Sequence, residues 1–206
     1  MKKILLIALF ALSAQFLSAQ IHFGPKIGYS AAKLSTDQSE ISSELKNSFT
    51  FGAFVRVGNK IYVQPEINFQ TVGGIFEKPQ KNNLSPFKDE VSLNTIEVPV
   101  LIGYKVLGIG VANLRVMGGP TANIVIDKSI KNKLNSYESV IKDKDINDIA
   151  WGLQLGAGFD VLMFTLDVRY NVGLSNAIKD INIGSTPIKL NSKSNVFTVS
   201  LGWKIL

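Results

Sequence analysis

The chain has 206 residues, with 22 Lys and Arg, 16 Asp and Glu, one His and no Cys. This length suits a single domain, and the lack of cysteine excludes a disulfide framework and a thiolate metal site. No tract of Lys and Arg lies beside aromatic residues, so the small basic excess predicts no nucleic-acid partner.

Residues 1–19 have the pattern of a secretory signal peptide. Lys2 and Lys3 form a positive start, residues 4–12 are all apolar, and Ser18 and Ala19 supply the small residues that precede a cleavage site. The apolar run is short for a transmembrane helix, which needs about 20 residues. The sequence therefore predicts an exported protein whose mature domain is residues 20–206. Removing Lys2 and Lys3 leaves 20 basic against 16 acidic side chains.

The mature sequence alternates between apolar residues and small or polar residues with a period of two, which is the spacing of β-strands. Residues 149–161 show this most clearly, since Trp151 and Leu153 alternate with Gly152 and Gln154. The predicted strands are residues 21–32, 48–57, 61–70, 96–106, 113–126, 149–161, 165–174 and 197–205. No part of the mature sequence is apolar enough for a transmembrane helix.

The connections between these strands alternate in length. Residues 35–47, 72–92, 127–148 and 175–194 form long polar links, whereas residues 58–60, 107–112 and 162–163 form short ones. Short turns on one rim and long loops on the other are typical of bacterial outer-membrane barrels, whose long loops lie outside the cell. The sheet must be closed, because an open edge in hydrocarbon would leave backbone groups without partners. The predicted fold is all-β: an eight-stranded antiparallel up-and-down transmembrane β-barrel in the cell outer membrane.

The two faces of the strands distinguish this fold from a soluble lipocalin-type barrel, which places its apolar face inward. The aromatic residues lie on the apolar face and gather near strand ends, like the interfacial girdle of a lipid-facing surface. The opposite face combines glycines with charges of both signs, which suits a narrow lumen. We predict a lumen charge network, structural or lining a pore, formed by Lys26, Arg56, Glu66, Glu97, Lys105, Arg115, Asp160, Asp167, Arg169 and Lys204.

Four prolines interrupt the predicted strands: Pro25, Pro65, Pro99 and Pro120. Each removes one hydrogen-bond donor from the ladder, so we expect them at bulges or near a rim.

Six short strings along the chain carry a family resemblance. They are residues 63–69 (VQPEINF), 96–101 (IEVPVL), 118–120 (GGP), 152–158 (GLQLGAG), 169–174 (RYNVGL) and 202–204 (GWK). In this order they resemble motifs of the PorT-like outer membrane β-barrel family of Bacteroidetes-type bacteria. The resemblance covers the mature chain and implies a small porin-family barrel of the Gram-negative cell envelope. The chain departs from that family by ending on Ile205 and Leu206 instead of an aromatic residue, which bears on how the insertion machinery reads the last strand.

Catalytic chemistry has little support in the sequence. Acyl hydrolysis needs a serine, a histidine base and a carboxylate that orients it. The only histidine, His22, begins the first strand, which places it on the periplasmic rim, away from the outer leaflet. One histidine and no cysteine also make a metal site improbable. We therefore predict a protein that is not an enzyme and uses no metal or cofactor.

Three functional hypotheses remain. The first is a structural or binding scaffold that acts through its outer loops or through an envelope protein partner. The second is a narrow ion or solute channel, and the third is a lipid-modifying hydrolase. Apolar residues in the loops either contact a partner or fold back over the barrel opening: Ile41, Leu45, Phe76, Phe87, Tyr137 and Val140. We expect a monomer that contacts outer-membrane lipid and the insertion machinery.

Overall fold

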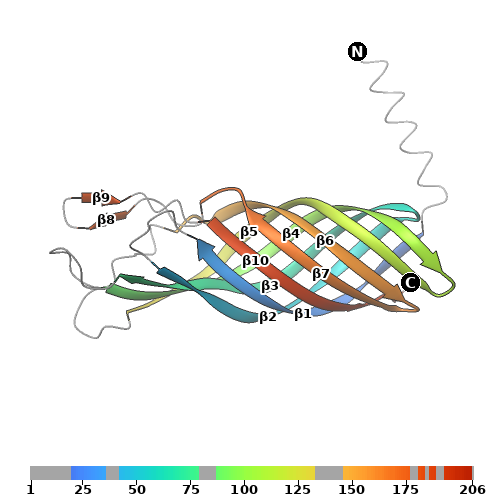
Figure 1. Ribbon diagram of the computed structural model, residues 1–206, viewed down its shortest axis with the longest axis horizontal. Helices are drawn as coiled ribbons and strands as arrows, with labels where there is room; N and C mark the ends of the chain where they lie inside the picture. The colour runs from blue at the N-terminus through green and yellow to red at the C-terminus, as the bar shows by residue number, and fades with distance from the viewer. Residues whose placement is uncertain are drawn as a thin grey trace, which may run out of the picture.

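A computed structural model describes residues 20–35, 42–78, 87–132, 146–176, 181–183, 186–188 and 193–205. Within these residues, eight strands form one closed antiparallel barrel, so the predicted fold class is confirmed (Figure 1). The strands are β1 (Ile21–Ser35), β2 (Ser42–Gly58), β3 (Ile61–Lys78), β4 (Phe87–Ile109), β5 (Ala112–Asn132), β6 (Ile149–Val161), β7 (Phe164–Gly173) and β10 (Lys193–Trp203). Residues 1–19, the predicted signal peptide, lie outside the described residues.

Every strand pairs with its neighbours in the chain, and β1 pairs with β10 to close the barrel. In the connection between β7 and β10, β8 (Ile181–Ile183) and β9 (Thr186–Ile188) form a separate two-stranded sheet. No helix among the described residues is both long and apolar enough to cross a membrane.

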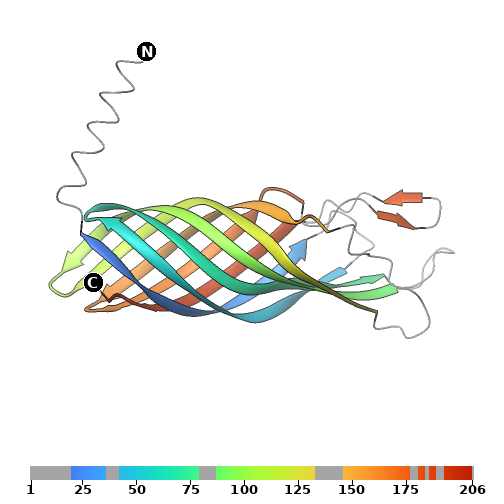
Figure 2. The ribbon, with the colours of Figure 1, turned by 180° about the vertical axis from the view of Figure 1, so that it is seen from behind.

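The two ends of the barrel differ, as Figures 1 and 2 show. At one end, which we call the turn end, three tight turns at residues 59–60, 110–111 and 162–163 lie beside the start of β1 and the end of the chain. Gly58 and Gly110 have positive φ there, and Leu162 is the one non-glycine residue with positive φ in the described chain. The opposite end, the loop end, carries the longer connections and the β8–β9 hairpin.

The strands are longer at the loop end than the sequence predicts. Residues 72–92 are expected to form a loop, yet β3 and β4 stay paired as far as Lys78 and Phe87. β2 likewise begins at Ser42 and β5 continues to Asn132. The prediction fails because the polarity of the two faces changes near Gln70 and Thr95. Beyond these residues the inward positions are apolar, so the expected alternation breaks down while the strand continues.

The prediction for the prolines is wrong in part. The register shifts lie between Leu45 and Phe51, between Asn94 and Thr95, and between Lys105 and Leu107, and none of them is at a proline. Pro99 and Pro120 lie well inside β4 and β5, where they pair with Thr121 and Leu153. Each residue of an antiparallel ladder exchanges its hydrogen bonds with one neighbouring strand only. A proline in this barrel therefore loses a bond on one side and keeps its pairing on the other.

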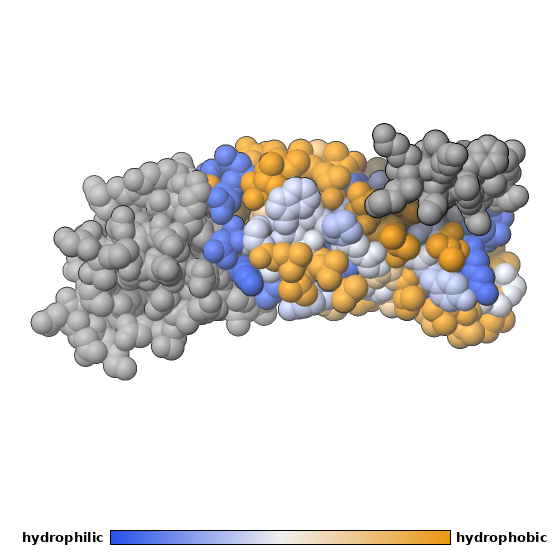
Figure 3. Space-filling view, turned by 90° about the horizontal axis from the view of Figure 1, so that it is seen from above, coloured by the Kyte–Doolittle hydropathy of each residue, from blue (hydrophilic) through white to orange (hydrophobic). Residues whose placement is uncertain are grey.

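The alternation of the sequence becomes an inner and an outer wall. In β7, exposed and buried residues alternate over the whole strand. The outer wall is apolar, with exposed residues such as Ile27, Ile102, Leu155 and Leu166. On the face drawn in Figure 3, hydrophobic residues cover the middle of the barrel and hydrophilic residues gather toward its ends. This outward band of apolar residues is what a surface in contact with lipid requires.

Candidate functional site

The lumen brings together the ten charged residues that the sequence places on one face. Eight of them are buried inside the barrel: Lys26, Arg56, Glu66, Glu97, Arg115, Asp160, Asp167 and Arg169. Lys105 and Lys204 are half-buried near the turn end, and Lys105 Nζ donates to Asn59 Oδ1 at 3.2 Å in the adjacent turn. Because the strands alternate strictly, residues far apart in sequence meet across the lumen.

The part of the network nearest the turn end is centred on Asp160. Arg56 Nη1 lies 2.8 Å from Asp160 Oδ2, and Arg115 Nε lies 2.9 Å from Oδ1. Lys204 Nζ is 3.7 Å from the same carboxylate. Tyr62 completes this group, since its hydroxyl accepts a hydrogen bond from Arg115 Nη1 at 3.0 Å and its ring centroid lies 4.9 Å from Arg56 Cζ.

The central part links two arginines through Asp167. Arg115 donates from Nη2 to Asp167 Oδ1, and Arg169 Nη2 lies 2.5 Å from Asp167 Oδ2. Arg169 also holds Glu66 with two parallel bonds, of 2.8 Å from Nη1 and 2.7 Å from Nη2. Lys26 Nζ lies 2.8 Å from Glu66 Oε2. The ion pairs therefore form one chain that runs along the barrel from Asp160 to Lys26. Bidentate arginine–carboxylate contacts of this kind are strong and fix geometry.

Glu97, closer to the loop end, is held by amide groups. It accepts hydrogen bonds from Asn68 Nδ2 at 3.3 Å, from Gln154 Nε2 at 3.2 Å and from Asn171 Nδ2 at 3.2 Å. Asn68 also donates to Glu66 at 3.1 Å, which joins Glu97 to the ion pairs. These three amide residues are not among the ten charged residues that the sequence predicts for the lumen. Their inward position in the alternation is the signal that could have found them.

The buried part of the network is balanced and tightly packed. Four buried basic residues face four buried acidic ones, so their formal charges cancel. Glycines make room for the long side chains. A Cβ on Gly103 would lie 2.0 Å from Tyr62 Cζ, and one on Gly158 would lie 2.5 Å from Arg115 Cζ. The side chains thus fill this part of the lumen, as expected for a barrel of eight strands.

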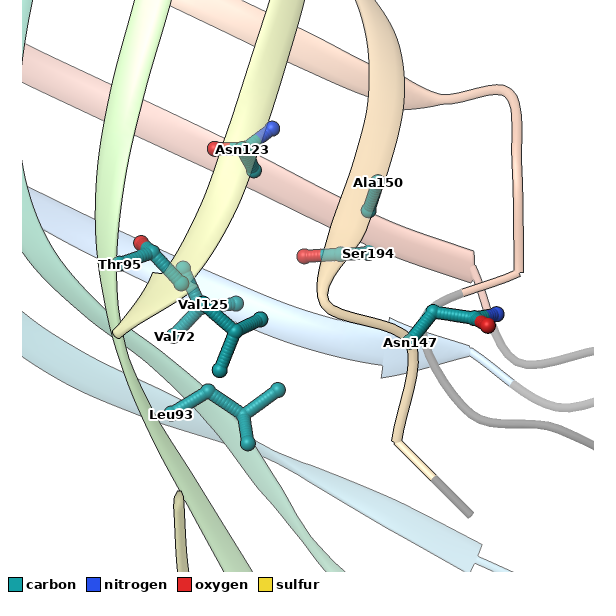
Figure 4. Close-up of a pocket in the computed structure, with 8 residues that line it drawn as sticks. All are labelled: Val72, Leu93, Thr95, Asn123, Val125, Asn147, Ala150 and Ser194. Carbon is teal, nitrogen blue, oxygen red and sulfur yellow. The ribbon is translucent and has the colours of Figure 1, made fainter. Parts of the chain in front are cut away.

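The interior changes character at the loop end. Ala32, Val72 and Val196 form a buried apolar cluster, and Val91 and Leu93 are also buried. A cavity of about 20 Å³ remains here, about the size of one water molecule. Figure 4 shows its lining, in which Val72, Leu93 and Val125 lie close together.

Residues 146–148 lead into β6 at this end of the barrel and continue its pairing with β5. Ile146 is 2 % exposed. Val125 N donates to Asp148 O at 2.8 Å, and Lys128 Nζ lies 2.8 Å from Asp148 Oδ1. Asn147 Nδ2 donates to Asn176 O at 2.7 Å. This segment is therefore hydrogen-bonded to β5 and to Asn176 at the loop end of the lumen, which we call the mouth.

The loop residues predicted to contact a partner fall largely outside the structure. Ile41, Tyr137 and Val140 lie outside the described residues, and only the backbone of Leu45, Phe76 and Phe87 is described. Within the described residues, no group of three His, Cys, Asp or Glu is arranged to hold a metal ion. The candidate sites within the described residues are therefore the lumen charges and the apolar loop end of the barrel.

Comparisons with known proteins agree with this architecture. The family model for the outer membrane protein beta-barrel domain matches residues 13–179 of the chain. No curated protein sequence matches significantly.

The solved structures that are similar to the chain include three small outer-surface or translocator proteins. Ail, the attachment invasion locus protein of Yersinia pestis, is 10 % identical, with 90 % of this chain and 99 % of that one covered at a TM-score of 0.45. Neisserial surface protein A is 13 % identical, with 91 % and 99 % covered at a TM-score of 0.45. The translocator domain of the autotransporter NalP from Neisseria meningitidis is 9 % identical, with 98 % and 95 % covered at a TM-score of 0.36. At these TM-scores the likeness supports no statement about role.

Proposed function

The chain belongs to the outer membrane protein beta-barrel domain family and lies in the outer membrane, and from this premise we propose that it is a non-catalytic binding scaffold. In this proposal the barrel is a sealed support, and the long connections at its loop end contact a partner outside the cell or in the envelope. The observation that carries the proposal is the continuous ion-pair chain from Asp160 to Lys26, which fills the lumen. Binding through loops on a rigid support is a common arrangement in proteins.

A narrow channel is the main alternative. A water-filled path would need the long side chains in the lumen to move aside. Each basic residue of the ion-pair chain, however, is held by a buried carboxylate. Breaking a buried ion pair costs about 3–5 kcal/mol, because the remaining charge stays buried without its partner. The apolar mouth adds a second obstacle to ions. The structure therefore favours a scaffold over a channel.

A lipid hydrolase has less support. The Ser30 hydroxyl, which faces the lumen, is hydrogen-bonded to Thr50 at 2.8 Å and to Thr198 at 2.9 Å. These hydroxyls are not bases, so they do not activate Ser30 as a nucleophile. His22 is the second residue of β1, at the turn end of the barrel, where it pairs with Arg56 of β2. We also propose that the chain is a PorT-like member of the family and that it has a cleavable signal peptide. The same proposal includes a monomeric barrel that the insertion machinery places in the membrane.

The proposal is tested by partner capture from outer membranes, using the full-length protein and a variant in which residues 133–145 are replaced by a Gly/Ser linker. A scaffold acting through its loops should lose its cross-linked partner in the variant, while heat-dependent migration in gels shows that the barrel is still folded. As a second measurement on the same proteins, planar bilayers should show no steady unitary currents. Equal capture by both proteins, or stable current steps from the wild type, would contradict the proposal.

A further inference from the structure

The outer wall of the barrel carries a groove of about 220 Å³ near the loop end. Its apolar side is formed by Phe49 and Phe51 of β2 and by Phe69 of β3. Phe49 is 81 % exposed and Phe51 is 59 % exposed, so both rings stand on the outer surface. Phe51 and Phe69 are stacked, with ring centroids 5.2 Å apart, and Tyr29 packs edge-on against Phe49 at 5.6 Å. The four rings form two pairs that share strand β2, and we call them the aromatic shelf.

Two irregularities of the sheet explain why the wall is hollowed here. The pairing of β2 with β3 changes register between Leu45 and Phe51. The pairing of β4 with β5 changes register where Asn94 and Thr95 oppose Asp127 and Val125, which leaves Ile126 as an extra residue. A bulge of this kind bends a strand and increases its local twist. The groove lies between these two sites, and Ile126 and Asn94 both contribute to its lining.

A row of polar side chains borders the shelf on the loop-end side. Thr71 donates from Oγ1 to Asn94 Oδ1 at 2.9 Å, and Asn94 donates from Nδ2 to Asp127 Oδ2 at 3.1 Å. All three side chains are on the outer wall, where the apolar band ends. Asp127 is exposed and pairs with no basic side chain among the described residues. The neighbouring Lys128 is directed to Asp148 instead.

We propose that this groove binds one outer-leaflet lipid, with an acyl chain along the aromatic shelf and an ammonium headgroup at the Asp127 carboxylate. The shelf belongs to the wall that faces hydrocarbon, so the occupant of its apolar part is an acyl chain. The charge at its border selects the headgroup, because a carboxylate attracts an ammonium group and repels an anionic lipid. Thr71 and Asn94 hold Asp127 in place through the hydrogen-bonded row.

The test uses the full chain in nanodiscs of phosphatidylcholine that contain spin-labelled phosphatidylethanolamine or phosphatidylglycerol. The fraction of motionally restricted lipid gives the relative association of each probe. We expect phosphatidylethanolamine to be preferred about threefold to fivefold, the effect of one partly exposed charge contact. Asp127→Asn should abolish this preference, and Phe51→Ala should lower the binding of both probes.

Phe197→Ala is the matched control, because Phe197 is an outward aromatic residue on β10 that does not line the groove. It should leave both probes unchanged. Equal binding of the two lipids by the wild type, an unchanged preference in Asp127→Asn, or the same effect from Phe51→Ala and Phe197→Ala would overturn the proposal. So would a dimer, detected by native mass spectrometry, that Phe51→Ala dissociates, because a second copy would then occupy the shelf.

Discussion

The interior of the barrel has two regions with opposite chemistry. Toward the turn end it is filled by arginines and carboxylates, with Arg115 fully buried among them. At the loop end it is filled by aliphatic side chains such as Val72, Leu93 and Val196. Both regions lie on the same strands and are equally inaccessible to solvent, so burial alone does not decide which residues occupy the lumen.

The outer wall changes in the opposite sense, from apolar to polar, near the level of Gln70 and Thr95. On the turn-end side of this level, outward residues such as Ile102 and Leu155 are apolar. On the loop-end side, Asn94 and Asp127 point outward. Outside the bilayer, the barrel follows the rule of water-soluble proteins, with an apolar core and a polar surface. Within the bilayer the apolar surface faces lipid, so the core is free to be polar if its charges are paired. We infer that the level at which both walls change polarity marks the edge of the hydrocarbon on the loop-end side.

The largest expected effect comes from breaking the charged region. Arg115→Ala removes the hydrogen bonds to Asp160, Asp167 and Tyr62 and leaves two carboxylates buried beside fewer cations. We expect the free energy of unfolding, measured with urea in detergent micelles, to fall by about 3–5 kcal/mol. Lys204→Ala is the control, because Lys204 is a weaker partner of the same carboxylate. It lies 3.7 Å from Asp160 and is 12 % exposed, whereas Arg115 lies 2.9 Å away and is fully buried. If both variants lose the same small amount, the ion-pair chain does not determine stability.

A second prediction compares the two levels of the outer wall on one strand. Ile102→Arg places a charge near the middle of the outward apolar run of β4 and should destabilise the barrel by about 2–4 kcal/mol. Ser92→Arg lies on the same wall of the same strand beyond the change in polarity, and should cost about 0–1 kcal/mol. Both are measured by folding equilibria in lipid vesicles. Equal costs would place Ser92 within the hydrocarbon and move the proposed boundary.

The sequence predicts the barrel and its charged lumen because the alternation assigns each residue to a wall. Once Glu66, Asp167 and Arg169 are on the inner wall of a narrow barrel, they have to approach one another. The partners themselves follow from the register between strands, which local periodicity does not contain. For this reason Asn68, Gln154 and Asn171 were not predicted to surround Glu97.

The strand ends beyond the membrane were missed for a different reason. The prediction assumes that apolar residues lie on the outer wall along the whole strand. At Val72 and Leu93, however, the apolar residues lie on the inner wall. The bulge at Ile126 also places two successive residues, Ile126 and Asp127, on the outer wall. Each effect interrupts the alternation of apolar and polar residues, and in the sequence such an interruption predicts the end of a strand. The full length of β3, β4 and β5 emerges only when the polarity of the surroundings is allowed to change along the strand.

The smallest effect is expected at the loop end, where Leu93 tests whether the mouth behaves as an apolar core. Leu93 is 2 % exposed and lines the small cavity, so Leu93→Ala enlarges a space that already exists. We expect a loss of about 2 kcal/mol, at the lower end for buried leucines. Hydrogen exchange should quicken in β3, β4 and β5 near the mouth and stay unchanged at the turn end, because the ion-pair chain is intact.

Leu93→Asn separates an apolar core from a polar lumen that happens to contain a leucine. Asparagine has the same number of side-chain heavy atoms, but its amide would be buried beside the apolar side chains of Val72 and Val125. Leu93→Asn should therefore lower the free energy of unfolding by at least as much as Leu93→Ala. If asparagine instead restored the stability of the wild type, the polar lumen would extend to the mouth, and the change of polarity would be confined to the outer wall.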